Sequence, residues 1–131
     1  MDKSLLASII QGEAGGLGPI GMMAVALSLH CRIWQHGHDQ ERIAAEYCGR
    51  AEPGPVALLL AGLVVERRLP DNPAYYCMGH GPDVVARGFK WGDWWLMDHS
   101  GTMGLHLYTV DNVPWETGVT ADGKKFWTRQ R

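Results

Sequence analysis

Residues 18–29 read GPIGMMAVALSL. A proline near the first turn favours a helix that begins at Gly18-Pro19. From Ile20 to Leu29 almost every side chain is apolar, so this helix has no polar face. A helix that is apolar on all sides belongs in the interior of a domain. The stretch therefore predicts a mainly helical domain arranged around a buried central helix.

Three further helices are predicted around the central one. The first has Ser4 as its N-cap and ends at Gly15-Gly16. The second is short and covers residues 39–47, and the third begins near Pro53 and Pro55 and stops before Pro70. The first helix carries an apolar stripe at helical spacing, which consists of Leu5, Leu6, Ile9 and Ile10.

The second half of the chain has a different residue pattern. From Asp71 onward, glycines, aromatic residues and turn signals replace the helical pattern, with one short helix expected near Trp94. Residues 121–124 (Ala-Asp-Gly-Lys) suggest the tip of a small β-hairpin near the C-terminus. The predicted fold class is mainly α (α+β), with a loop-rich second half. At 131 residues, we expect one domain over 1–131.

Composition excludes several classes of function. The net charge is −2 and the basic residues are scattered, so no nucleic acid partner is expected. The longest apolar stretch, Pro55 to Val65, is too short to cross a bilayer. Three cysteines form no disulfide framework, and the first residues do not resemble a secretory signal. We therefore expect synthesis in the cytoplasm without a classical signal peptide, no stable insertion into a membrane, and no cofactor.

Glu13 is the candidate catalytic residue. It continues the apolar stripe of the first helix, four residues after Ile9 and three after Ile10, so its side chain is predicted to point inward. Apolar surroundings and the negative end of the helix dipole both disfavour an ionised carboxylate there, so its pKa should rise. A carboxyl that keeps its proton near neutral pH can act as a general acid. The alternative is a glutamate that reaches solvent or caps a neighbouring backbone group.

The residues around Glu13 resemble a known motif. They are Gln11-Gly12-Glu13-Ala14-Gly15-Gly16, then Gly21, then Ala24-Val25-Ala26 and Arg32. This pattern resembles the opening motif of the cell wall hydrolases related to spore-cortex-lytic enzymes. A looser similarity continues through residues 56–65 and 71–76, so that the resemblance covers roughly residues 4 to 95.

The resemblance implies a lysozyme-like fold that cleaves peptidoglycan glycan strands between N-acetylmuramic acid and N-acetylglucosamine. The activity would be that of a lytic transglycosylase or a muramidase, with Glu13 as the catalytic acid. Several polar positions of the family motif differ in this chain, where Gly15, Leu17, Met22 and Cys31 stand. These changes leave the acid in place and make its surroundings more apolar.

Glycan cleavage needs further groups besides the acid. No second carboxylate is evident from the pattern, although Asp83, Asp93 and Asp98 are candidates. Without one, the N-acetyl and 6-hydroxyl groups of the substrate would serve, giving a 1,6-anhydro product. Aromatic side chains with a polar edge suit sugar rings. We expect Tyr75 and Tyr76, then Trp94 and Trp95, to bind the glycan, with only one residue of each adjacent pair facing the groove.

Alternative functions remain open from sequence alone. A zinc amidase could draw on Cys77, His80 and other histidines, although no second ligand cluster matches their spacing. A nonenzymatic wall-binding or virion module on the same scaffold is a second alternative. A cysteine nucleophile at Cys31 is disfavoured by its position on a buried helix. The expected setting is the bacterial cell wall, reached by a phage endolysin after holin-type release or by a similar route, and the oligomeric state is left open.

Overall fold

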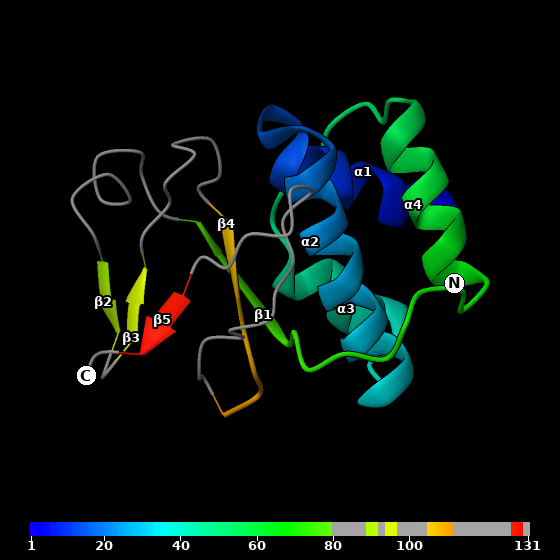
Figure 1. Ribbon diagram of the computed structural model, residues 1–131. Coiled ribbons are helices and arrows are strands. Elements are labelled where there is room, and N and C mark those ends of the chain that lie inside the picture. Colours follow the sequence, from blue (N-terminus) through cyan, green and yellow to red (C-terminus); the bar gives the residue numbers. More distant parts are fainter. Residues whose placement is uncertain (80–88, 92–93, 97–104, 112–126, 130–131) are drawn as a thin grey trace.

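The computed structural model describes residues 1–79, 89–91, 94–96, 105–111 and 127–129. This part of the chain is mainly helical and contains four α-helices and small antiparallel sheets (Figure 1). The helices are α1 (Lys3–Ala14), α2 (Gly18–His30), α3 (Gln40–Glu46) and α4 (Pro55–Val65). A short 3-10 turn, η1 (Gly15–Leu17), joins α1 to α2, and a π turn, η2 (Cys31–Gln35), extends α2.

The central position predicted for the helix that begins at Gly18, α2, is confirmed. Within α2, the side chains of Val25, Ala26 and Leu29 are fully buried. On one side α2 packs against α1 and α4, and on the other it contacts strands β1 (Tyr76–Gly79) and β4 (Leu105–Tyr108). The apolar composition of this helix is thus explained by partners on several sides, as expected for an interior helix.

The beginning of α1 differs from the prediction. Asp2 is the N-cap, and its Oδ1 accepts hydrogen bonds from the backbone N–H groups of Ser4 (2.9 Å) and Leu5 (3.3 Å). The assignment of Ser4 as the cap was wrong, because the Asp2 carboxylate reaches both amides and the helix begins two residues earlier than a Ser4 cap would place it. The predicted end is confirmed, since α1 stops at Ala14 with Gly15 as its C-cap.

The other two predicted helices are confirmed. Asp39 caps α3, accepting a hydrogen bond from the backbone N–H of Arg42 at 2.8 Å. Pro55 is the first residue of α4, where its missing N–H needs no intrahelical partner. α4 ends at Val65, well before Pro70.

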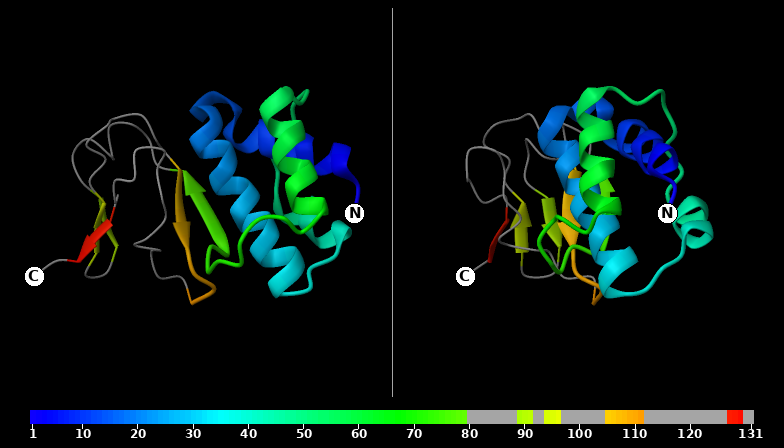
Figure 2. Two further views of the ribbon diagram at one scale, coloured as in Figure 1. Left: turned by 45° about the vertical axis from the view of Figure 1, so that its right-hand side comes forward. Right: turned by 90° about the vertical axis from the view of Figure 1, so that its right-hand side faces the viewer.

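The strands form two small sheets. In the first sheet, β1 and β4 pair antiparallel, with Tyr76 opposite Tyr108. The second sheet has three strands in the order β2-β3-β5, which are β2 (Phe89–Trp91), β3 (Trp94–Leu96) and β5 (Trp127–Arg129). Figures 1 and 2 show the two-stranded sheet between the helices and the three-stranded sheet.

The second half of the chain also corrects one prediction. The short helix expected near Trp94 is wrong, because β3 is a strand hydrogen-bonded on both sides, and tryptophan suits strands. The hairpin tip expected at residues 121–124 lies outside the described residues.

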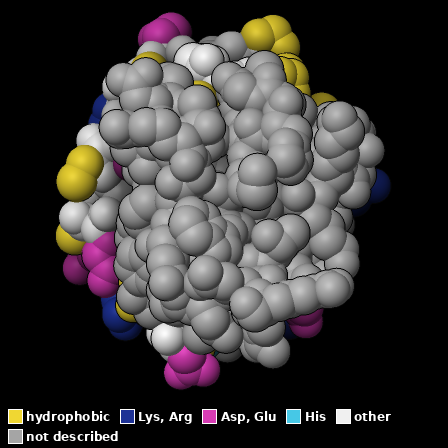
Figure 3. Space-filling model, turned by 60° about the vertical axis from the view of Figure 1, so that its left-hand side comes forward, with side chains coloured by type: hydrophobic (Ala, Val, Ile, Leu, Met, Phe, Trp, Pro, Cys, Tyr) yellow, Lys and Arg dark blue, Asp and Glu magenta, His cyan; other side chains and the backbone are white. Residues whose placement is uncertain are grey.

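Figure 3 shows one face of the molecule, on which the described side chains lie at the edge. Around the edge of the face in Figure 3, the coloured side chains include acidic, basic and hydrophobic groups that do not gather into one patch among the described residues. None of the described helices is long and apolar enough to cross a membrane.

Candidate functional site

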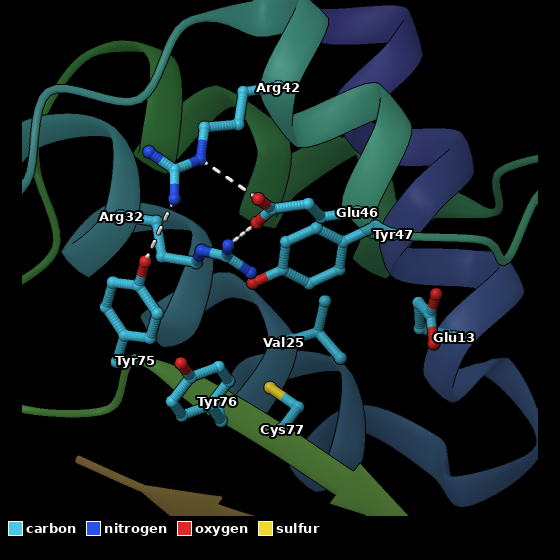
Figure 4. A pocket seen from close by; sticks show the side chains of 9 residues that line it. All are labelled: Glu13, Val25, Arg32, Arg42, Glu46, Tyr47, Tyr75, Tyr76 and Cys77. Atoms are coloured by element: carbon cyan, nitrogen blue, oxygen red, sulfur yellow. Dashed lines mark hydrogen bonds and ion pairs between the residues drawn. The ribbon is translucent and has the colours of Figure 1, made fainter. Parts of the chain in front are cut away.

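A pocket of about 380 Å³ lies where α1, α2, α3 and β1 meet (Figure 4). This volume lies within the usual range for small-ligand sites. The pocket is lined by Glu13, Val25, Arg32, Arg42, Glu46, Tyr47, Tyr75, Tyr76 and Cys77. The structure therefore brings together three of the five predicted site residues, Glu13, Tyr75 and Tyr76.

Glu13 lies in the last turn of α1, half-buried at the edge of the pocket. The stripe before it is fully buried at Ile9 and Ile10, so the inward direction predicted for this helix face is confirmed. Glu13 Oε1 accepts a hydrogen bond of 2.7 Å from the backbone N–H of Gly49, which is the backbone contact considered as its alternative role. The second carboxylate oxygen, Oε2, has no hydrogen-bond partner within the described part of the chain.

Two glycines allow the approach that fixes Glu13. A Cβ on Gly12 would lie 2.2 Å from the backbone nitrogen of Arg50, and a Cβ on Gly49 would lie 2.7 Å from the backbone nitrogen of Glu13. Neither distance is possible for a real side chain, and the obstructing atoms belong to the backbone. Glycine at both positions lets α1 and the segment after α3 touch, and this contact sets the position of the Glu13 carboxyl.

Arg32 forms the opposite wall of the pocket. Arg32 is only 7% exposed. Its guanidinium carbon lies 5.3 Å from the ring centre of Tyr47 and 4.7 Å from that of Tyr75. Arg32 also forms an ion pair with Glu46, and its Nε donates a hydrogen bond of 3.2 Å to Nδ1 of His38. A buried guanidinium with this set of partners is compensated both by charge and by aromatic faces. Arg32 follows α2 directly, in the π turn.

Glu46 is a second carboxylate on the pocket, and sequence reasoning missed it. Arg42 Nε donates to Glu46 Oε1 at 2.9 Å, while Arg32 pairs with Oε2, so each oxygen faces a guanidinium. The i,i+4 spacing of Arg42 and Glu46 on a predicted helix was the available signal for their pairing. Asp83, Asp93 and Asp98, the carboxylates considered from sequence, lie outside the described residues.

The two tyrosines both line the pocket, which corrects the expectation that only one of them would. Tyr75 is buried and Tyr76 is 40% exposed, with ring centres 4.6 Å apart and planes at 72°. Strict alternation fails because Tyr75 precedes β1 and Tyr76 is its first residue. The Tyr75 hydroxyl lies 3.3 Å from Nε2 of His38. The pKa of His38 is lowered, mainly by desolvation and to a smaller extent by the positive charges of Arg42 and Arg32.

Trp94 and Trp95 lie in β3, where Trp95 pairs with Lys90 on one side and Thr128 on the other. The structure describes the backbone of this strand but not its side chains. Their predicted contact with the glycan is therefore not tested.

Burial keeps two further polar groups of the pocket, Tyr47 and Cys77, neutral near pH 7. The Tyr47 hydroxyl lies 2.5 Å from Ser28 Oγ, and Ser28 in turn donates to the carbonyl oxygen of Tyr75 at 3.1 Å. Burial raises the pKa of the Tyr47 phenol, and it raises the pKa of the Cys77 thiol to about 12. Burial also raises the pKa of Cys31, which keeps this thiol protonated and unreactive.

Comparisons with protein-family models, curated proteins and solved structures find no match for this chain. Among the described residues, no three His, Cys, Asp or Glu side chains lie where they could hold a metal ion, and His80 of the zinc-amidase alternative is outside that part.

Proposed function

We propose that this protein cleaves the glycan strands of peptidoglycan, between N-acetylmuramic acid and N-acetylglucosamine, with Glu13 as the general acid. The observation that carries the proposal is that Glu13 lines one pocket together with Tyr75 and Tyr76. A general acid must lie at a cavity that admits the substrate. Tyrosine rings offer apolar faces and hydroxyl groups that match the two sides of a sugar ring.

In the proposed reaction, the carboxyl group of Glu13 first donates a proton and later accepts one. Glu13 transfers its proton to the glycosidic oxygen as the bond from that oxygen to the anomeric carbon breaks. One oxygen, Oε1, is fixed by the Gly49 N–H, and Oε2 is left for the substrate. The oxocarbenium-like centre is then captured by a nucleophile, which can be water or a group of the substrate.

Glu46 is badly suited to act as that nucleophile. Both of its oxygens face guanidinium groups, of Arg32 and Arg42, so its lone pairs are engaged. This favours a transglycosylase route in which the 6-hydroxyl of the sugar attacks the anomeric carbon. Glu13, ionised by the first step, accepts the proton of that hydroxyl, and the product has a 1,6-anhydro end. The N-acetyl group of the substrate supports the cationic intermediate.

A lysozyme-like fold is part of the proposal. It is supported by a carboxyl-bearing helix that ends at the pocket, a buried central helix beside it, and a small antiparallel sheet across from the helices (Figure 2). We place the activity at the bacterial cell wall, with the protein made in the cytoplasm and released as a phage endolysin would be.

The decisive variant is Glu13→Gln. The amide oxygen can still accept the Gly49 hydrogen bond, so the variant should fold, while the transferable proton is lost. We expect the rate of clearing of purified sacculi to fall about 100-fold or more, the typical contribution of a general acid. The matched control is Glu52→Gln, the same change at an exposed position, which should clear sacculi at the wild-type rate. Clearing by Glu13→Gln at the wild-type rate would refute the assignment.

Mass spectrometry of the released fragments identifies the reaction. Anhydro ends indicate a transglycosylase, reducing N-acetylmuramic acid indicates a hydrolase, and free stem peptides indicate an amidase. A wild-type protein that sediments with sacculi but releases no fragments would instead be a nonenzymatic wall-binding module.

A further inference from the structure

The pocket carries an excess of positive charge in its active state. The acidic and basic side chains that line it are two carboxylates, Glu13 and Glu46, and two guanidinium groups, Arg32 and Arg42. The proposed mechanism begins with a proton on Glu13, which leaves one carboxylate against two cations. Tyr47 and Cys77 add no negative charge near pH 7, because burial raises the pKa of each.

The excess charge is available at Arg42 rather than at Arg32. The Arg32 side chain is 8% exposed, and its guanidinium is stacked between two rings, paired with Glu46 and bonded to His38. The Arg42 side chain is 52% exposed. Its Nε bonds to Glu46, one terminal nitrogen makes only a 3.5 Å contact with the Tyr75 hydroxyl, and the other has no partner among the described residues (Figure 4).

We infer that Arg42 binds a carboxylate of the substrate. The terminal nitrogens of a guanidinium group present parallel N–H donors that match the two oxygens of a carboxylate. The sugar rings of peptidoglycan are uncharged, and its carboxylates belong to the stem peptides and to those lactyl groups that carry no stem peptide. The substrate class is thus a glycan strand that carries carboxylates, in preference to a neutral amino-sugar polymer. This inference rests on the proposed function.

The competing role for Arg42 is structural. An exposed i,i+4 pair with Glu46 would stabilise α3 only slightly, and its effect would not depend on the charge of the substrate. The two roles are separated by changing the substrate and the protein in the same experiment.

The experiment uses soluble peptidoglycan fragments in two forms, native and with all carboxylates converted to methylamides. For the wild type, we expect kcat/KM to be about tenfold lower on the amidated form, the effect of one charge-assisted hydrogen bond. Arg42→Gln should lose about tenfold on the native form and nothing further on the amidated one. Arg42→Lys should recover part of the loss.

The matched control is Arg68→Gln, which removes an exposed arginine that is also paired with a glutamate, Glu66. It should behave as the wild type on both substrates. Wild-type cleavage of both forms at equal rates would overturn the inference and leave the proposed function intact, as would an Arg42→Gln enzyme that still discriminates. No cleavage of either form by the wild type would refute the proposed function itself. If Arg42→Gln does not fold, the wild-type comparison alone decides.

Discussion

The two sides of the pocket are built in different ways. On the Glu13 side, α1 and the segment after α3 meet backbone to backbone, because Gly12 and Gly49 have no side chains to keep them apart. On the Arg32 side, charged groups of η2 and α3 meet the rings of Tyr47, which follows α3, and Tyr75, which precedes β1. In Figure 4, Glu13 lies apart from the arginines, with Tyr47 and Val25 between them.

This difference separates two requirements of a catalytic pocket. Glu13 is positioned by a backbone contact that leaves no room for an additional atom, so a larger side chain at Gly12 or Gly49 should displace it. The opposite wall is held together by the ion pair between Arg32 and Glu46, so the removal of either charge should destabilise it. Two substitutions test these two requirements, and a third tests the burial of a thiol at the same pocket.

Gly12→Ala should have the largest effect. The new methyl group would meet backbone atoms of Gly49 and Arg50 that cannot rotate away, and overpacking of this kind costs about 3 kcal/mol of unfolding free energy. Glu13 would also lose its hydrogen bond from Gly49, so cleavage should fall with stability. Urea unfolding and sacculus clearing measure the two effects.

The control for Gly12→Ala is Gly16→Ala, where an added Cβ meets no atom within 4 Å. Its unfolding free energy should match that of the wild type. Equal stability of the two alanine variants would mean that the backbone contact does not constrain the site.

Arg32→Met should have an intermediate effect. Methionine keeps an unbranched apolar side chain but removes the ion pair with Glu46 and the stacking on Tyr47 and Tyr75. We expect a loss of about 2 kcal/mol, below that for a fully buried pair, because Glu46 keeps Arg42 and is 35% exposed. Thermal unfolding measures the loss. A fully stable Arg32→Met would show that the guanidinium is not needed to assemble this wall.

The smallest effect concerns pH and Cys77, which lies in β1 at the pocket. Its pKa is about 12 in the folded protein and 9.0 for a free thiol, so the folded state retains the proton to higher pH. The resulting stability is fully present below pH 9 and is lost as the pH rises toward 12. Between pH 9 and pH 10 this amounts to about 1 kcal/mol.

Cys77→Ala should show a shallower decline in unfolding free energy over that pH range than the wild type. Cys48→Ala, at an exposed thiol, is the matched control and should keep the wild-type slope. Identical slopes for Cys77→Ala and the wild type would contradict the burial of this thiol.

The sequence predicted the helices more fully than the pocket. Helix ends depend on neighbouring residues, so the central helix from Gly18 and the end of α1 at Gly15 followed from local pattern. The Ser4 assignment failed because Asp2 and Ser4 are both suitable N-cap residues, and the Asp2 carboxylate accepts hydrogen bonds from the backbone N–H groups of Ser4 and Leu5.

The pocket combined predictable and unpredictable features. The direction of Glu13 followed from helical spacing within α1. The pairing of Arg32 with Glu46 joins residues 14 positions apart through a π turn and a loop, whose path no local rule fixes. The stacking of Arg32 on Tyr75 depends in the same way on how β1 docks beside α2.

The hydrogen bond from Gly49 to Glu13 has a practical consequence for spectroscopy. A backbone N–H directed at a carboxyl oxygen changes its chemical shift when that carboxyl gains or loses a proton. The Gly49 amide signal of a ¹⁵N-labelled sample is therefore a built-in reporter on Glu13, readable by nuclear magnetic resonance without any substrate. Adding a glycan fragment during such a titration would reveal whether occupancy of the pocket is felt at the acid.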